Sequence, residues 1–394
     1  MRLGRVGTNR NQGADRNAAD DLDRTPTGPR GPDTPNEGAG FFPISSAGAP
    51  WRLILIGAAA VALALAALYR FPPHALPCGP FDPQREGARV PSLLAQLHDP
   101  VHWDHNFEYA WAQRSLTHAL AWRLVIPVVC HDLGLTDLEY LWVPWIGALA
   151  LLGAVAWYAW QATREIERVV LVLAFFVTAS AWSSSVGVLG CMDSWYLLAL
   201  LGFCFSRSPV VGLMACLCGP WIDERFLLAL PLCAALRCEE KRWWLPVLGI
   251  LPYLAIRLAA VAAGDDSVGG HLQLVSAPLG RFALWLPIGW WHGWRAGWVV
   301  VAAGLVLFWW PRRTTQVWLL AAGMLGLAAT GLLAWDSSRS IAVLLPWLIV
   351  GASRYRGPSW PLWLLAAVNF IVPAAFVTAV WSGTAGFVPA ALPM

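Results

Sequence analysis

Long apolar segments alternate with short polar connections from Trp51 to the end of the chain. Because about 20 apolar residues in a helix cross the hydrocarbon layer of a bilayer, the longer segments predict membrane-spanning helices. These segments are 51–69, 138–160, 169–187, 243–263, 296–310, 316–334 and 360–381. Shorter apolar segments, which we interpret as tilted, half-length or re-entrant helices, are 194–206, 209–220, 226–237 and 341–352. The pattern predicts an all-α fold, a polytopic transmembrane helix bundle of about 9–12 spans.

Residues 1–50 lack this pattern and are rich in Gly, Pro, Asn, Asp and Arg. A segment with so few apolar side chains cannot bury enough surface to offset the loss of chain entropy. We therefore expect a disordered tail at 1–50 and a transmembrane domain at 51–394. No secretory signal is expected, because the first apolar segment starts only after residue 50 and no small-residue cleavage site follows it.

Basic residues recur in alternate loops, and this pattern predicts the orientation of the helices because loops rich in Lys and Arg stay cytoplasmic. If the tail is cytoplasmic, the Arg-containing loops on its side are 163–168, 206–209, 237–242, 311–313 and 353–357. The loops on the outer side are then 70–137, 188–193, 221–225, 264–295 and 335–340, which hold most of the acidic and His residues. In the long outer loop 70–137, residues 107–128 predict an amphipathic helix at the membrane interface.

The composition agrees with a membrane protein and argues against several other classes. The chain is 57% hydrophobic and 13% charged, whereas soluble domains carry about 25% charged residues. Its net charge of +3 is small and dispersed, so we expect no nucleic-acid partner. We find no Walker A sequence, no GxSxG elbow and no dinucleotide-binding glycine fingerprint, so we expect no nucleotide partner.

Charged residues gather at the outer ends of several predicted spans. They are Asp193, Asp223, Glu224, Arg225, Asp336 and Arg339. Any tight connection between helices needs polar residues, but charges at the membrane edge are costly unless they are paired or functional. The recurrence on one side predicts a shared polar cavity that opens outward. Asp223 or Glu224 could hold Arg225 in place or bind a cation, and the sequence leaves both roles open.

The long outer loop also contains a cluster of His and acidic residues. His102, Asp104 and His105 are close in sequence, but neither a helix nor a strand brings all three together, and no HExxH pair is present. We therefore assign no residue as a metal ligand. The only cofactor that we keep open is a weakly held divalent cation that bridges carboxylates to a substrate phosphate.

Four features of the sequence resemble those of a known family. They are the motif "DERF..ALP" from Asp223, the motif "D.SRS....LP" from Asp336, the long acidic outer loop and the many predicted spans. Over residues 51–381 the chain resembles polytopic bacterial membrane proteins of the C-type glycosyltransferase superfamily. The resemblance implies a bacterial inner-membrane enzyme with a cytoplasmic N-terminus. Such an enzyme transfers a sugar from a polyprenyl phosphate or diphosphate donor to an acceptor on the extracytoplasmic side.

The resemblance also implies an acidic residue of the first outer loop as the catalytic base. Carried over, Asp104 is the first choice for this role, and Asp99 and Glu108 compete with it. The chain departs from the family pattern here, because its loop has no acidic pair separated by one residue.

The departing lipid phosphate gathers negative charge, which arginine side chains can stabilise through forked hydrogen bonds. We assign Arg225, Arg339 and Arg257 to this role. Arg257 lies inside an apolar stretch, so its side chain either extends outward to the membrane surface or contacts the lipid phosphate. The residues expected to support the polar cavity are Asp193, Asp223, Glu224, Asp336, His102 and His105.

Two other functions stay open. A transporter or flippase for a lipid-linked or anionic solute would use the acidic and arginine residues as gates. Such a carrier needs polar groups near the middle of the membrane, whereas the predicted spans contain almost only Ala, Leu, Val, Gly and Trp in their middle. A non-catalytic membrane subunit would tolerate the loss of Asp104 or Arg339.

Overall fold

The computed structural model describes residues 50–70, 94–101, 123–187, 192–240, 242–262, 287, 289–309, 314–333, 337–372, 375–379 and 385–389. The chain divides into two compact units, Met1–Pro43 and Ile44–Met394. All described residues belong to the second unit, and the expected tail at 1–50 lies almost entirely outside them.

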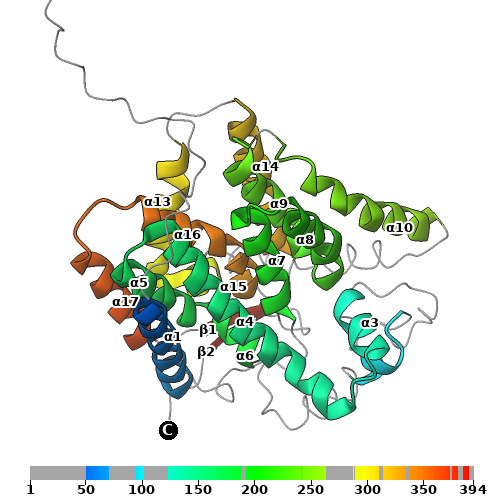
Figure 1. Ribbon diagram of the computed structural model, residues 1–394, viewed down its shortest axis with the longest axis horizontal. Helices are drawn as coiled ribbons and strands as arrows, with labels where there is room; N and C mark the ends of the chain where they lie inside the picture. Colours follow the sequence, from blue (N-terminus) through cyan, green and yellow to red (C-terminus); the bar gives the residue numbers. More distant parts are fainter. Residues whose placement is uncertain are drawn as a thin grey trace, which may run out of the picture. The chain divides into compact units, whose positions relative to one another are not determined.

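Helices make up most of the described residues (Figure 1). In the first half of the chain they are α1 (Pro50–Arg70), α3 (Val125–Asp132), α4 (Asp137–Thr163), α5 (Ile166–Val177), α6 (Ser180–Gly187), α7 (Asp193–Phe205), α8 (Pro209–Ile222), α9 (Arg225–Arg237), η3 (Pro246–Ile250) and α10 (Leu251–Ala262). In the second half they are η4 (Arg295–Gly297), α13 (Trp298–Trp309), α14 (Thr314–Leu333), α15 (Ser337–Ser340), η5 (Ile341–Leu344), α16 (Leu345–Arg354) and α17 (Trp360–Ile371). The strands β1 (Ala375–Ala379) and β2 (Ala385–Pro389) form an antiparallel hairpin in which Ala375 lies opposite Pro389.

Local sequence signals explain where the best-defined helices begin and end. Thr136 and Glu139 form a reciprocal capping box that starts α4, and Arg164 ends it in the left-handed conformation with φ of 58°. Ser208 caps α8, whose first residue is Pro209. These caps satisfy backbone groups that a helix end leaves without intrahelical partners.

Each of the eleven predicted apolar segments contains a helix, but three of the longer segments differ from a single α-helix. In the segment 243–263, the turn at 243–245 and the 3-10 helix η3 precede α10, which begins at Leu251. The segment 169–187 is divided into α5 and α6 at Thr178, whose hydroxyl bonds the carbonyl oxygens of Ala174 and Phe175. The segment 360–381 was expected to be one helix, and this expectation is wrong. Helix α17 ends at Ile371, and β1 occupies 375–379 because this part contains β-branched and aromatic residues near Pro373. The predicted helical class therefore holds for the described residues apart from the hairpin.

The number of membrane spans is a separate matter from the helical class. Among the described helices, only α4 is both long and apolar enough to cross a membrane, and 50% of its most apolar stretch is buried in the protein. The core helix of a soluble protein can have the same properties. Of the expected interfacial helix at 107–128, the structure describes only the last residues, at the start of α3.

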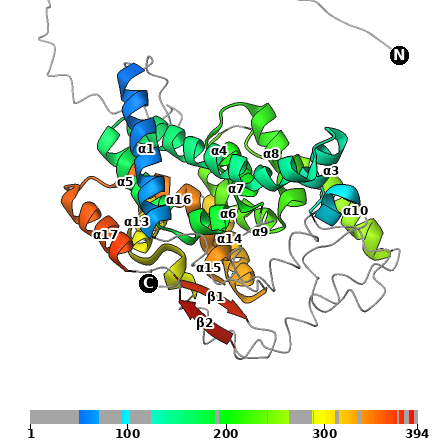
Figure 2. The ribbon, with the colours of Figure 1, turned by 90° about the horizontal axis from the view of Figure 1, so that it is seen from below.

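Helix α16 lies at the centre of the described fold, and its residues 345–352 are all buried. It packs against α13, α4, α5 and α7. On the outside of this core, α1 packs against α5 and α4 (Figure 2). The buried side chains Phe175, Phe203 and Trp347 fill the space between these helices.

Glycines allow two helix pairs to approach closely. Gly351 of α16 faces the carbonyl oxygen of Val300 on α13, and Gly304 of α13 faces that of Trp347 on α16. On α14, Gly323 and Gly326 face the backbone of α9 in the same way. A methyl group at any of these positions would overlap backbone atoms, so the contacts depend on the absence of a Cβ.

The close contact between α13 and α16 predicts that Gly351→Ala destabilises the protein. The added Cβ overlaps the Val300 carbonyl oxygen, and neither backbone can move without disturbing the core. We expect a loss of about 1–3 kcal/mol in the free energy of unfolding, measured by thermal unfolding of the purified full-length protein. Gly153→Ala on α4 is the matched control, because its methyl group enters open space and should stabilise the helix slightly. Equal stability of the two variants would contradict the packing described here.

Candidate functional site

Two buried aspartates lie at adjoining helix ends. Asp193 is the first residue of α7, where its charge interacts favourably with the helix dipole. Asp223 follows α8 in an extended conformation that ends the helix, and its carboxylate accepts the backbone N–H of Arg225 at 3.0 Å. Each aspartate is only 1% exposed. Charges this deeply buried must be paired.

Arg225, the first residue of α9, joins the two aspartates. Its Nε and Nη2 donate to Oδ1 and Oδ2 of Asp223, each at 2.7 Å, in a bidentate pair. Its Nη2 also donates to Oδ1 of Asp193 at 2.7 Å. The guanidinium lies 4.9 Å from the ring centroid of Tyr196, which covers one of its faces.

Two further arginines extend the network at its ends. Arg339 of α15 donates through Nε and Nη2 to both oxygens of Asp193, with an Nη2–Oδ1 distance of 2.9 Å. Arg123, which precedes α3, contacts Oδ2 of Asp223 through Nη2 at 2.9 Å. We call the five side chains Arg123, Asp223, Arg225, Asp193 and Arg339 the Arg–Asp network. Its two outer arginines keep part of their surface exposed, 11% of the Arg123 side chain and 17% of that of Arg339.

The network holds both aspartates in the ionised form. Burial alone raises the pKa of Asp193, but the charges of Arg225 and Arg339 outweigh burial and lower the pKa below its ordinary value. Burial likewise raises the pKa of Asp223, and Arg225 and Arg123 lower it further than burial raises it. Burial lowers the pKa of Arg123, but the negative charges of Asp223 and Glu224 outweigh burial and raise the pKa above its ordinary value.

A second aromatic contact adjoins the network through α8. Trp221 packs edge-on against Tyr253 of α10, with ring centroids 4.6 Å apart. The guanidinium of Arg257 lies 5.3 Å from the Trp221 ring centroid and 5.4 Å from that of Tyr253. Arg257 is 8% exposed, so it does not extend freely outward as one reading of the sequence expected.

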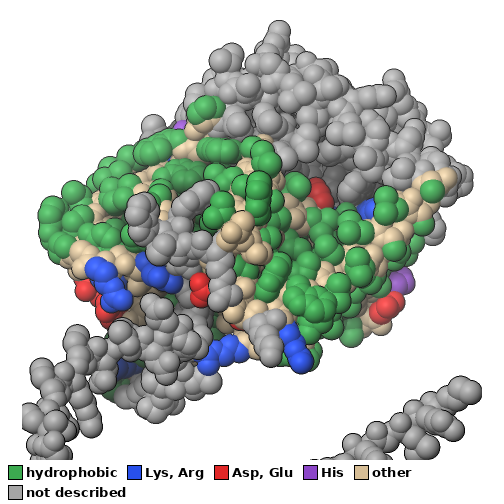
Figure 3. Space-filling model, turned by 90° about the horizontal axis from the view of Figure 1, so that it is seen from above, with side chains coloured by type: hydrophobic (Ala, Val, Ile, Leu, Met, Phe, Trp, Pro, Cys, Tyr) green, Lys and Arg blue, Asp and Glu red, His purple; other side chains and the backbone are tan. Residues whose placement is uncertain are grey.

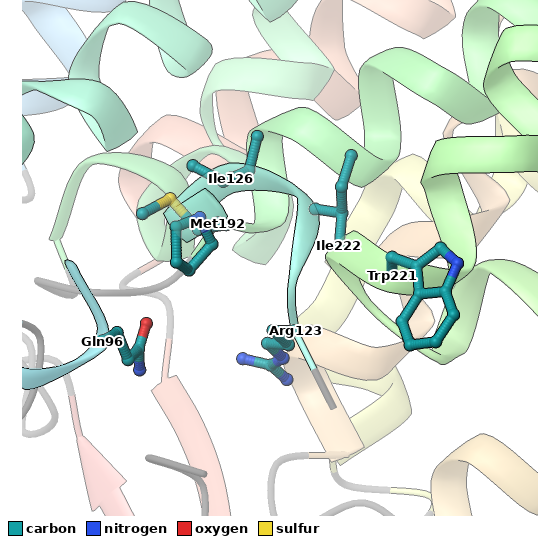
Figure 4. Close-up of a pocket in the computed structure, with 7 residues that line it drawn as sticks. Gln96, Arg123, Ile126, Met192, Trp221 and Ile222 are labelled. Carbon is teal, nitrogen blue, oxygen red and sulfur yellow. The ribbon is translucent and has the colours of Figure 1, made fainter. Parts of the chain in front are cut away.

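A narrow crevice lies beside the network (Figure 4). It is a shallow gap between side chains and has no room for a water molecule. Its lining residues are Gln96, Arg123, Ile126, Pro127, Met192, Trp221 and Ile222. The backbone N–H of Leu124 donates to the carbonyl oxygen of Trp221 at 2.9 Å and joins the start of α3 to the end of α8 beside the crevice.

The structure brings together four of the residues singled out in the sequence, Asp193, Asp223, Arg225 and Arg339. Of the two roles open to the acidic pair, the structure gives Asp223 that of holding Arg225 in place. Glu224 lies beside this pair, partly buried, and its Oε2 has no hydrogen-bond partner among the described residues. Asp193, Asp223 and Arg225 are each 6% exposed or less and are paired with one another.

Other predicted residues are not brought into this site. Asp99 is exposed, and its backbone N–H bonds the carbonyl oxygen of Ala95. His102, Asp104, His105, Glu108 and Asp336 lie outside the described residues. Within the described ranges, no three His, Cys, Asp or Glu side chains are grouped so that they could hold a metal ion.

Sequence reasoning missed two features of the site. Arg123 was not singled out, although its position just before an apolar segment matches that of Arg225. Gln96 was not singled out, because it is a single uncharged polar residue in the run Leu93–Leu97. Chain comparisons give no further guide: no protein-family model, no curated protein and no solved structure matches the chain.

A second polar cluster lies in the middle of the predicted span 169–187. Arg295, which is 1% exposed and has φ of 50°, donates to the carbonyl oxygens of Thr178 and Val372, and to that of Asn369 at 2.6 Å. The Asn369 side chain accepts the N–H of Ala296 at 2.9 Å and donates to the Thr178 hydroxyl at 3.3 Å. The expectation that polar groups are absent from the middle of the predicted spans is therefore wrong at Thr178.

The Arg–Asp network predicts a specific dependence of stability on pH. Asp193 and Asp223 have lowered pKa values in the folded protein, against an ordinary value of 3.8. Their stabilisation is therefore complete above about pH 4 and is lost as the pH falls towards the folded-state pKa values. Asp193→Asn leaves Arg225 and Arg339 short of a carboxylate and should cost about 3–5 kcal/mol in the free energy of unfolding at neutral pH.

Thermal unfolding of both proteins between pH 3 and 7 tests this expectation. The melting temperature of the wild type should fall more steeply below pH 4 than that of Asp193→Asn. Asp132→Asn at the exposed end of α3 is the control and should behave like the wild type. A wild-type melting temperature for Asp193→Asn at neutral pH would contradict the role of the network.

Proposed function

We propose that the chain is a multi-pass protein of a bacterial inner membrane that transfers a sugar from a polyprenyl-(di)phosphate donor to an acceptor on the extracytoplasmic side. The observation that carries the proposal is the Arg–Asp network, which holds three guanidinium groups at helix ends predicted to face outward. Planar guanidinium groups suit the oxygens of a phosphate ester.

The surface of the described helices supports a membrane location. Large apolar side chains are highly exposed on several helices, including Ile54 (70%), Leu149 (64%), Trp318 (70%) and Leu325 (72%). Figure 3 shows a broad face covered by hydrophobic side chains, with charged side chains mostly along its edges. Contiguous apolar surface of this kind is rare on soluble monomers but is expected for helices in contact with lipid.

The network supports binding of the donor phosphate through its two outer arginines. Arg225 is held by both aspartates, so its role is to keep the helix ends together and to fix the charges. Arg339 and Arg123 each keep part of the side chain exposed and can present donors to a ligand. As the sugar is transferred, the leaving phosphate gains charge, and arginines already fixed in place would stabilise it without reorganisation.

An acidic residue of the outer loop would remove the proton of the acceptor hydroxyl, which is a poor nucleophile unless a base assists it. Asp104 is our first choice for this base, and Asp99 and Glu108 are the competitors. Asp99 lies three residues after Gln96, which lines the crevice beside the network. This placement supports testing Asp99 together with Asp104.

The cluster around Arg295 favours a second candidate function, a transporter or flippase for a lipid-linked or anionic solute. Helix breaks with buried polar groups within a membrane-spanning segment are typical of transporters. The break between α5 and α6 at Thr178, with its carbonyl bonded by Arg295, is such a feature.

The membrane topology can be tested with reporter fusions to truncated chains. We expect alkaline phosphatase, which is active only outside the cytoplasm, to be active when fused after Gly134. Green fluorescent protein, which fluoresces in the cytoplasm, should be fluorescent when fused after Arg164 or Glu240. These positions lie in predicted loops on opposite sides. A cytoplasmic signal at all three positions would exclude the proposed topology.

The enzymatic activity can be tested with radiolabelled polyprenyl-linked sugars and membranes that contain the protein. We expect transfer by the wild type and a loss of about 100-fold or more for Asp104→Asn, because a general base contributes at least this much. Asp99→Asn tests whether Asp99 rather than Asp104 is the catalytic base. Arg339→Ala tests the contact with the donor phosphate. Arg207→Ala, in an exposed position of a predicted cytoplasmic loop, is the control at matched expression.

The two candidate functions predict different results. Donor-dependent transfer that disappears in Asp104→Asn and Arg339→Ala supports the glycosyltransferase. If no donor gives transfer and the protein carries solute across proteoliposome membranes, the result supports the transporter and contradicts the glycosyltransferase.

A further inference from the structure

Helices α7, α8 and α9 pack together as one unit of short helices of matched length (Figure 1). They contain 13, 14 and 13 residues. Since an α-helix rises by 1.5 Å per residue, each of the three is about 20 Å long. The hydrocarbon layer of an ordinary bilayer is about 30 Å thick. The unit is therefore about 10 Å too short to cross such a layer with both of its ends in water.

Polar groups lie at both ends of this unit. At one end, the Arg–Asp network joins the start of α7, the end of α8 and the start of α9. At the other end, Arg237 of α9 donates to the carbonyl oxygen of Phe203 at 2.9 Å and to the carboxylate of Glu240 at 2.6 Å. Glu239, Glu240 and Arg242 are exposed at this end. Exposed charges are costly in hydrocarbon, so they must remain in contact with water or lipid headgroups.

Helix α4 passes beside the unit and extends beyond it at both ends. Near the network, the indole N–H of Trp195 donates to the carbonyl oxygen of Val143 at 3.1 Å. Val143 lies six residues, or about 9 Å, after the start of α4. Near the other end, the rings of Tyr158 and Phe205 lie 5.5 Å apart, and Tyr158 is five residues, or about 8 Å, before the end of α4. The unit thus lies beside the middle of the one described helix that is long enough to cross a membrane.

One face of α8 gives the unit a surface for lipid. Four side chains on this face are 42–65% exposed: Val210, Val211, Leu213 and Met214. Their spacing is that of one side of a helix, and Gly212 on the opposite side is buried. They lie in the first two turns of α8, directly after the exposed Ser208 that caps the helix. Lipid chains that cover this face therefore end at polar residues.

We infer that α7, α8 and α9 fit a bilayer whose hydrocarbon layer is locally thinned to about 20 Å, and that the lipid that suits the α8 face has short acyl chains. A bilayer becomes thinner beside a segment that is shorter than its hydrocarbon layer. The thinned layer brings the outer headgroups to the level of Arg339, whose side chain is 17% exposed. This inference rests on the membrane location in the proposed function but not on sugar transfer.

The full-length protein in nanodiscs of phosphatidylcholine tests the fit to bilayer thickness. The acyl chains have fourteen, eighteen or twenty-two carbons and one double bond each. We expect the melting temperature to be highest in the thinnest bilayer and to fall by several degrees in the thickest. Hydrogen–deuterium exchange locates the effect: residues 213–218 of α8 should exchange several-fold faster in the thickest bilayer. Residues 147–156, in the middle of α4, should exchange alike in all three.

A matched pair of lysine substitutions measures the depth of the hydrocarbon layer at two helices. Met214 is 49% exposed near the middle of α8, and Leu149 is 64% exposed near the middle of α4. A lysine side chain in the middle of a thinned layer can extend its ammonium group to the headgroups, whereas one in a layer of ordinary thickness cannot. In the eighteen-carbon bilayer, Met214→Lys should therefore lower the melting temperature less than Leu149→Lys. An equal or larger loss for Met214→Lys counts against the inference.

The same melting temperature and the same exchange in all three bilayers would overturn the inference, and so would the highest stability in the thickest bilayer. Its failure is distinguishable from that of the proposed function. If the reporter fusions give the expected topology but bilayer thickness has no effect, this inference alone fails. If the protein inserts into none of the three bilayers, the membrane location fails and this inference fails with it.

Discussion

The arrangement of the helix ends depends on the burial of Arg225 between Asp193 and Asp223. Removing these three charges from water is costly, and only short, well-aligned hydrogen bonds can compensate for that cost. The bidentate pair with Asp223 and the shared contact with Asp193 provide this alignment. Because the charges belong to the starts of α7 and α9 and the end of α8, any shift of one helix along another would leave a charge without its partner.

The glycine contacts provide a different kind of constraint in the same fold. The Arg–Asp network fixes the helix ends through directional bonds, whereas Gly304 and Gly351 allow α13 and α16 to meet along their backbones. Close backbone contact does not require water to be expelled from apolar side chains, so it is effective inside lipid as well as inside a soluble core. The two constraints together account for a fold that can be well defined although its surface is largely apolar.

The apolar pattern of the sequence predicted where helices occur, because apolar segments of this length have few alternatives to a helix. It could not predict the division at Thr178, which depends on a carbonyl that Arg295 bonds from a distant part of the chain. The strand at 375–379 was likewise missed, because a short apolar run suits either a helix or a strand. Most charged members of the site were found because charges stand out in an apolar chain. Gln96 was not found, since an uncharged polar residue becomes unusual only when its burial is known.

The pairing of Asp193 with Arg339 joins residues that are 146 positions apart in the chain. During synthesis, Asp193 and Arg225 emerge long before Arg339. Asp193 therefore has only one of its two arginine partners until most of the chain has been made. Until then, the junction of α7, α8 and α9 holds a partly compensated charge. Arrival of α15 completes the pairing, so a chain that stops before Arg339 lacks the last contact of the junction. The network is therefore complete only when residues from both halves of the chain are present.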